Sequence, residues 1–157
     1  MRIGRPVGIA VVALLGVLGG VDACAGHRPT GLDHHTYVHR VNTVCSRTND
    51  RIRALTPPDP LDPASSLVTT RSAIELQRRA VDSIAALRPS APDRQTASSW
   101  LEVEPRALDA EAAIVAAIAA EDQHRIDEAT RRARELESRA RRLAQRLGLQ
   151  ACASSSA

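Results

Sequence analysis

Apolar side chains recur every three or four residues along four long stretches of this chain, which is the pattern of helices that bury one face. The stretches span roughly residues 33–55, 64–87, 93–120 and 122–148. No stretch alternates apolar and polar residues as a half-buried strand does. The pattern therefore predicts an all-α fold, an antiparallel four-helix bundle. A three-helix bundle with the first or second helix poorly docked is the alternative.

Sequences that cannot continue a helix separate the first three stretches. Residues 56–63 and 88–92 contain repeated prolines, which lack a backbone N–H and push the preceding residue out of the helical region. Pro105 falls inside the third stretch, so we expect a kink there or a helix that starts one turn later. The connection between the third and fourth stretches is very short, which favours antiparallel neighbours.

Polar residues and a glycine mark the expected helix ends. Asp33 or Thr36 is placed to cap the first helix, because short polar side chains accept hydrogen bonds from its first free N–H groups. Asp93 and Asp122 hold the same position before the third and fourth helices. Gly148 is expected to end the fourth helix in the left-handed conformation.

The fourth stretch has the most regular repeat. Its apolar residues follow one another at alternating spacings of three and four, as in a coiled-coil seam; they are Ile126, Ala129, Ala133, Leu136, Ala140, Leu143 and Leu147. Arg132, Arg139 and Arg146 share one flank of this repeat. We expect a solvated flank that pairs with Glu104 and Glu111, with lipid head groups or a partner helix as alternatives.

The N-terminal residues have the three parts of a secretory signal. Arg2 and Arg5 are the only charges before an apolar run over residues 7–21, and small residues follow around Cys24. The run is shorter than the roughly 20 residues that span a bilayer. We therefore expect residues 1–24 to be a signal peptide or a lipoprotein anchor.

Three outcomes are compatible with this segment. In the first, Val21 and Ala23 place Cys24 in a lipobox and Cys24 becomes the acylated first residue, although Asp22 departs from the usual pattern. In the second, an ordinary small-x-small site is cut and the protein is secreted. In the third, nothing is cut and the segment stays as a membrane anchor. Each outcome places the protein outside the cytoplasm.

The rest of the chain is long enough for one domain with its own core. We expect a tether over residues 25–35, a helical domain over 36–153 and a disordered tail over 154–157. All 21 basic residues are arginine, the net charge is +3, and Tyr37 and Trp100 are the only aromatic residues. With so few platforms for stacking bases, nucleic acid is not an expected partner.

Two cysteines remain in the helical domain. In an up-down-up-down bundle the start of the first helix and the end of the fourth lie at the same end, and the segment after Gly148 is able to fold back there. Cys45, inside the first helix, and Cys152 are therefore expected to form a disulfide, which an oxidising compartment preserves. Two independent thiols are the alternative.

This layout resembles a broad group of small exported helical proteins and lipoproteins of actinobacteria. The resemblance covers roughly residues 36–153 and rests on the tether, the segment 37–45 around the first domain cysteine, the proline-rich break and the ending 147–153. It implies a helical fold and an extracytoplasmic location, and it supplies no catalytic residues.

Histidines near the first helix are the main candidates for chemistry. His35 and His39 are four residues apart and share a helix face, with His34 beside them and Asp33 as a further ligand for a metal ion. A zinc site of the usual kind needs a further ligand pair at defined spacing. An exposed polar start to the helix is the simpler interpretation.

The sequence contains no arrangement typical of a catalytic triad, a catalytic thiol or a phosphate-binding loop. We therefore expect a protein of the bacterial envelope that is not an enzyme, needs no cofactor, and has a structural or partner-binding role with the membrane as its attachment. An extracytoplasmic metal-binding protein that uses His34, His35 and His39 is the alternative.

Overall fold

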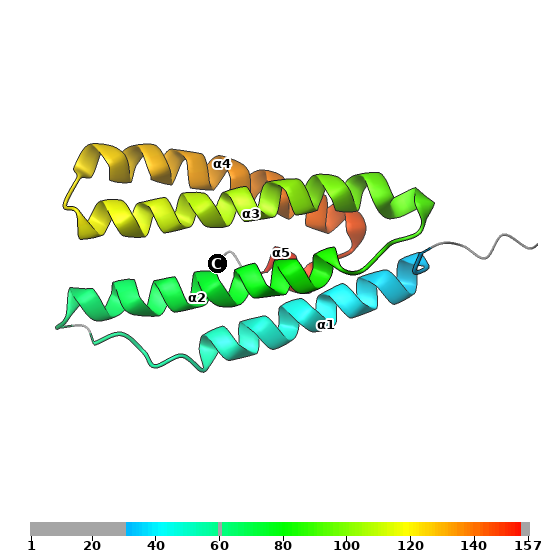
Figure 1. Ribbon diagram of the computed structural model, residues 1–157, viewed down its shortest axis with the longest axis horizontal. Coiled ribbons are helices and arrows are strands. Elements are labelled where there is room, and N and C mark those ends of the chain that lie inside the picture. The colour runs from blue at the N-terminus through cyan, green and yellow to red at the C-terminus, as the bar shows by residue number, and fades with distance from the viewer. Residues whose placement is uncertain (1–30, 60, 155–157) are drawn as a thin grey trace, which may run out of the picture.

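The computed structural model describes residues 31–59 and 61–154, and it contains five helices. They are α1 (His34–Arg53), α2 (Pro63–Ala85), α3 (Ala91–Ala119), α4 (Gln123–Leu147) and the short α5 (Gln150–Ala153). The four long helices run in alternating directions (Figure 1). An isolated bridge between Leu32 and Pro89 is the nearest approach to a β-structure in the described residues. The predicted all-α bundle is therefore confirmed.

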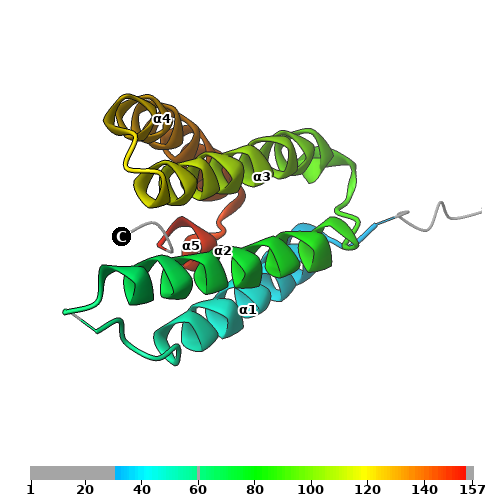
Figure 2. The same ribbon diagram turned by 60° about the vertical axis from the view of Figure 1, so that its left-hand side comes forward.

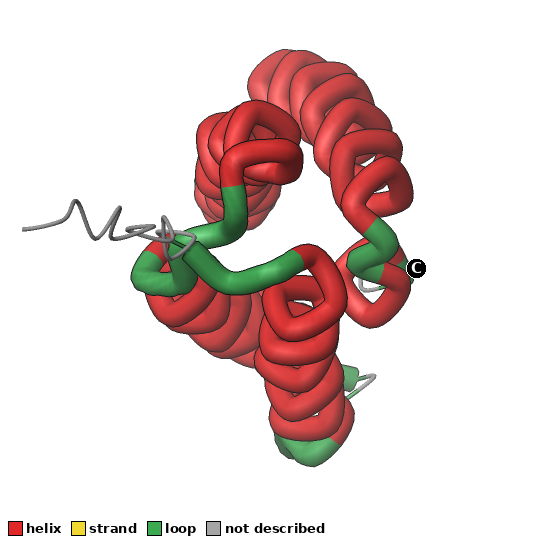
Figure 3. Tube along the Cα trace, turned by 90° about the vertical axis from the view of Figure 1, so that its right-hand side faces the viewer, coloured by secondary structure: helices red, strands yellow, loops and turns green. Residues whose placement is uncertain are grey.

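The long helices form two layers joined along one side. α3 packs on α4, α1 packs on α2, and contacts between α2 and α3 join the two pairs (Figures 1 and 2). The chain turns back after α4, so that α5 packs against both α1 and α4. Seen along the helices, α5 lies at the side of the bundle between the two layers (Figure 3). A short helix thus takes the place of a direct α1–α4 interface.

Three of the expected helix ends are confirmed. The Asp33 carboxylate accepts a hydrogen bond from the Thr36 N–H at 3.0 Å and caps α1. Asp122 caps α4 by accepting from the Arg125 N–H at 3.1 Å. Gly148 ends α4 with φ 76°, a conformation that glycine adopts without steric cost.

The start of α3 differs from the prediction. The N-cap is Ser90, whose side chain makes no capping hydrogen bond, and Asp93 lies in the first turn. The helix begins earlier because a proline at Pro92 is well tolerated where no intrahelical N–H bond is needed. α3 also continues through Pro105, so the later start that this proline suggested is wrong.

Two clusters of buried residues form the core. The larger contains both aromatic residues, Tyr37 and Trp100, which are 0% and 2% exposed. The smaller lies between α2 and α3 and consists of Ile74, Val81, Leu108 and Val115. Alanines dominate the buried seam between α3 and α4, which allows close approach of these helices; they are Ala107, Ala110, Ala133, Ala140 and Ala144.

The C-terminal segment is attached to α1 by a disulfide and by hydrogen bonds. Cys45 and Cys152 are bonded with their Cα atoms 5.2 Å apart, within the range that a disulfide allows, which confirms the predicted pair. Asn42 donates to the Gly148 carbonyl at 3.1 Å and accepts from the Ala151 N–H at 3.0 Å. Asn49 donates to the Ala151 carbonyl at 3.0 Å.

The spacing of these residues explains the attachment. Asn42, Cys45 and Asn49 are three and four residues apart, so they share one face of α1. The two asparagines satisfy backbone groups of a segment that leaves the helix ladder at Gly148, where such groups would otherwise be unpaired. Leu149 is fully buried beneath this segment, which adds apolar contact to the polar bonds.

Replacing both bonded cysteines by alanine is expected to lower the free energy of unfolding by about 2–5 kcal/mol. The bond closes a loop between residues 107 apart, and the chain-entropy model gives roughly 4–5 kcal/mol for such a loop. Urea unfolding of the wild type and of the Cys45→Ala, Cys152→Ala variant measures the difference. A reductant should bring the wild type to the variant's stability and leave the variant unchanged; a wild type indifferent to reductant contradicts the prediction.

Asn42→Ala is expected to destabilise the protein by about 1–3 kcal/mol, and Asn49→Ala by less, because Asn42 makes two hydrogen bonds to the C-terminal segment and Asn49 one. Urea unfolding under oxidising conditions measures both. Ser46→Ala, an exposed change on the same helix, is the matched control and should have no effect. Equal losses for Asn42→Ala and Ser46→Ala would show that these bonds carry no stability.

Candidate functional site

The predicted histidine cluster is divided by the fold. Nδ1 of His34 lies 3.1 Å from a carboxylate oxygen of Asp93 on α3, whereas His35 and His39 are exposed on α1. The Asp33 carboxylate is engaged in capping. Over residues 31–59 and 61–154, no three His, Cys, Asp or Glu side chains are grouped so as to hold a metal ion.

Asp93 has an inward role that its sequence position did not reveal. Its second carboxylate oxygen is buried without a hydrogen-bond partner, and so is the hydroxyl of Tyr37. Burial raises the pKa of Tyr37, and the charge of Asp93 raises it further. The first turn of α3 is thereby connected to α1 through His34 and to the aromatic core beside Tyr37.

Three partly buried carboxylates lie on α3 and α4: Glu104, Glu111 and Glu137. Burial raises the pKa of Glu104 to about 7, and the charges of Glu111 and Glu137 add to the effect. The pKa of Glu111 is raised for the same two reasons, burial first and Glu137 second. No ion pair joins Glu104 or Glu111 to the arginine flank of α4 in the described chain, so the expected pairing is not formed.

Glu104 lies beside the disulfide. Together with Cys45, Cys152 and Trp100 it lines a small cavity of about 20 Å³. That volume holds at most about one water molecule, so this interior position offers no room for a larger ligand. We expect the Glu104 carboxylate to influence how the stability of the protein depends on pH.

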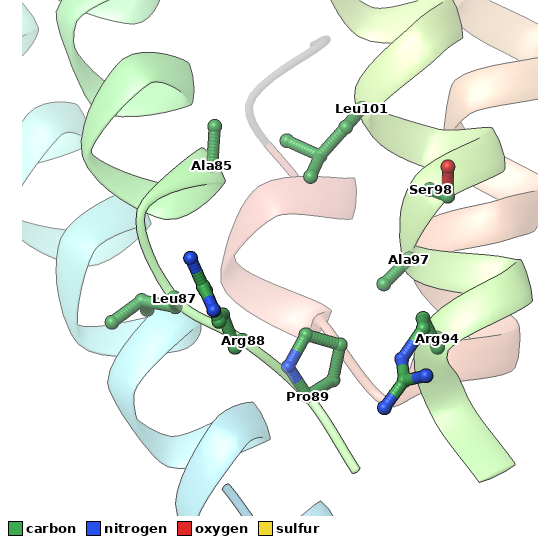
Figure 4. Close-up of a pocket in the computed structure, with 8 residues that line it drawn as sticks. All are labelled: Ala85, Leu87, Arg88, Pro89, Arg94, Ala97, Ser98 and Leu101. Atoms are coloured by element: carbon green, nitrogen blue, oxygen red, sulfur yellow. The ribbon is translucent and has the colours of Figure 1, made fainter. Parts of the chain in front are cut away.

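A pocket lies between the end of α2 and the start of α3. Its volume is about 480 Å³, within the range of small-molecule sites. The lining residues are Ala85, Leu87, Arg88, Pro89, Arg94, Ala97, Ser98 and Leu101. We call this the α2–α3 pocket. Arg88 and Arg94 lie on either side of Pro89, and Leu101 lies farther along the opening (Figure 4).

The loop that forms one wall of the α2–α3 pocket is held by the start of the described chain. The Leu32 N–H donates to the Arg88 carbonyl and the Ser90 N–H donates to the Leu32 carbonyl, both at 2.7 Å. Gly31 approaches so closely that a Cβ atom there would lie 2.4 Å from the Pro89 carbonyl oxygen. Only glycine fits this contact, so residues 31 and 32 fix the loop and, with it, the position of Arg88.

The two arginines of the α2–α3 pocket are not neutralised. Neither guanidinium forms an ion pair with the part of the chain that the structure describes. The lining contains no carboxylate, because Asp93 is turned towards His34 and the core. Two other pockets have a glutamate in the lining as well as two arginines: Glu128 beside Arg125 and Arg132, and Glu75 beside Arg71 and Arg79.

This pocket was not found from the sequence. Residues 88–92 indicate only a helix break, and Arg88 and Arg94 are two among 21 arginines in the chain. Only the folded structure distinguishes these two arginines from the others. Leu32 is bridged to the loop that carries Arg88, and the Asp93 carboxylate is turned inward, away from the pocket.

The comparisons with known proteins add no assignment: no protein-family model, curated protein or solved structure matches this chain. The predicted signal segment 1–24, with Cys24, lies outside the described residues. Among the helices that the structure describes, none has the length and apolar character needed to cross a membrane.

Glu104→Gln is expected to remove much of the pH dependence of stability between about pH 5 and 8. In the wild type the folded state holds the Glu104 proton up to a pKa of about 7, while the unfolded chain releases it near 4.5. The unfolded state therefore loses its proton first, and the free energy of unfolding falls as pH rises, by about 1–3 kcal/mol for this partly buried group.

Urea unfolding at a series of pH values measures this change. Glu102→Gln, an exposed glutamate two residues away on α3, is the matched control and should keep the wild-type slope. Glu111, whose pKa is also raised, should leave a smaller residual slope in the Glu104→Gln variant. Parallel pH curves for the wild type and Glu104→Gln would contradict the assignment.

Proposed function

We propose that this protein is an exported helical bundle of the bacterial envelope, tethered to the membrane by its N-terminal segment, with a binding rather than a catalytic role. The Cys45–Cys152 disulfide is the observation that carries the proposal. Disulfides persist in oxidising compartments outside the cytoplasm and are rare inside it. The signal-like sequence of residues 1–24 supplies the matching route.

The geometry of the two ends supports a tethered module. The described chain enters the fold at Gly31 and Leu32, directly against the α2–α3 loop. The other end is bonded to α1 through Cys152. The bounds expected for the tether, 25–35, are too long at the C-terminal side, because α1 begins at His34 and Leu32 is bonded to the loop. A tether that ends before Gly31 would hold the end of the bundle with the α2–α3 pocket nearest to the membrane.

The chemistry of the candidate site supports binding. The α2–α3 pocket combines two cationic side chains with an apolar wall, a combination that recognises a ligand by charge and shape. No observation favours metal binding through His34, His35 and His39 as a second function, because His34 contacts Asp93 across the α1–α3 boundary. The resemblance to exported actinobacterial helical proteins agrees with the proposal and remains a prediction.

Intact mass of the protein isolated from its native host tests export and tethering. We expect a chain that lacks the residues before Cys24 and carries acyl groups on this residue, with no free thiol on Cys45 or Cys152. Alkylation before and after reduction counts those thiols. Cys24→Ala should abolish the acyl groups, leaving either an uncut precursor in the membrane or a cleaved, secreted chain.

Ser46→Ala is the matched control and should leave the cleavage site, the acyl groups and the location unchanged. Cleavage without acyl groups would identify the secreted form, and an uncut chain in the membrane would identify the anchor; both retain export. A full-length chain in the cytoplasm with both domain cysteines reduced would refute the proposal.

A further inference from the structure

We propose that the α2–α3 pocket binds a small amphipathic anion, a carboxylate or phosphate head group attached to an apolar chain. This inference deepens the binding role proposed above. It rests on the proposed function only in one respect, namely that the protein encounters its ligand outside the cytoplasm. The kind of ligand is inferred from three properties of the pocket: its charge, its shape and the hydrogen bonds that hold its wall.

The head group is defined by Arg88 and Arg94. Both line the pocket, and neither has an ion-pair partner among residues 31–59 and 61–154. Both arginines border the same pocket, whose lining contains no carboxylate, so an anion bound there is attracted by two positive charges. Guanidinium groups bind carboxylate and phosphate through paired N–H donors, so these two chemistries fit best.

The apolar chain is defined by the part of the lining that lies away from the two arginines. It consists of Leu101, which is partly exposed, and Ala85, which is exposed. Leu101 lies away from the arginines along the opening (Figure 4). Charge at one end and exposed leucine surface at the other match a ligand with a head and a tail, and a volume of about 480 Å³ accommodates a short alkyl chain.

The pocket is held open by a rigid wall. Leu32 donates one hydrogen bond to the Arg88 carbonyl and accepts another from the Ser90 N–H, so the loop is held on both sides of Pro89. Gly31 lies in close contact with the Pro89 carbonyl. A site whose walls are already positioned loses less conformational entropy on binding. Arg88 is therefore presented to the ligand by a loop that does not have to reorganise.

The charge also argues against the chain's own N-terminal segment as the occupant. The residues immediately before Gly31 include His27 and Arg28 and no acidic residue after Asp22. A segment of the same charge sign as the two arginines has no favourable electrostatic interaction with them. An external anion is the complementary partner.

Titration of the full-length, disulfide-bonded protein with octyl phosphate and with octanoate, kept below micelle-forming concentrations, tests the inference. Binding is followed by calorimetry and by amide chemical shifts. We expect saturable binding with shifts at Leu87, Ala97 and Leu101. Inorganic phosphate alone should bind more weakly because it lacks the tail, and octyltrimethylammonium should not bind in the pocket.

Two double variants that each remove two positive charges distinguish binding in the α2–α3 pocket from non-specific attraction to the protein surface. Arg88→Gln with Arg94→Gln should weaken octyl phosphate binding about tenfold or more, since each guanidinium contributes a charge-assisted bond. Arg71→Gln with Arg79→Gln, in the pocket that already contains Glu75, should change it less than about twofold. Equal weakening by both variants, or equal binding of octyltrimethylammonium, would overturn the inference.

The ligand's source is distinguished with vesicles. If phosphatidylglycerol vesicles displace octyl phosphate from the pocket of the wild type and of the Arg71/Arg79 double variant, and phosphatidylcholine vesicles do not, the anion is a membrane lipid. If octyl phosphate or octanoate binds and phosphatidylglycerol vesicles do not displace it, the ligand is a free amphiphile. Both results support the pocket. Failure of all three probes with an intact disulfide and correct export would overturn this inference and leave the proposed function standing.

Discussion

The attachment of the C-terminal segment to α1 is the interaction on which the remaining structure depends. α1 and α4 do not form an interface of their own, and α5 lies between them. One face of α1 supplies a covalent bond through Cys45 and three hydrogen bonds through Asn42 and Asn49. These bonds close the side of the bundle that helix packing alone leaves open. They also hold Leu149 in the core.

A partly buried carboxylate, Glu104, lies beside the same attachment. A glutamate such as Glu104 is costly to bury in its charged form, and Glu111 and Glu137 add repulsion. The cost is lowered by a raised pKa, so that Glu104 carries its proton over much of the acidic range. The covalent bond restricts the unfolded chain and offsets part of what remains. The disulfide and the carboxylate with the raised pKa therefore lie next to each other, because Glu104, Cys45 and Cys152 line the same cavity.

Local sequence predicted the helices well and the contacts between distant residues less well. The periodicity of apolar residues, the caps at Asp33 and Asp122 and the glycine at position 148 are short-range signals, and each was confirmed. The Cys45–Cys152 pair was predictable because the helical domain contains only these two cysteines and the expected bundle brings their segments to the same end. Asp93 was misjudged as a cap, since the same carboxylate serves His34 and faces Tyr37 from across the fold. The α2–α3 pocket depends on Leu32 meeting Pro89, a contact that residues far apart in the chain make only after folding.

The position of the disulfide has a mechanical consequence for a protein attached by its N-terminus. Residues 46–151 lie inside a covalent loop, because Cys45 and Cys152 are joined. A force that pulls the two ends of the chain apart passes through this bond and cannot extend the loop, which would otherwise lengthen by roughly 350 Å. The load falls on the start of α1 and on the pair of hydrogen bonds at Leu32. The α2–α3 loop is therefore the first part of the bundle to respond to tension on the tether, while most of the helical core is shielded from it.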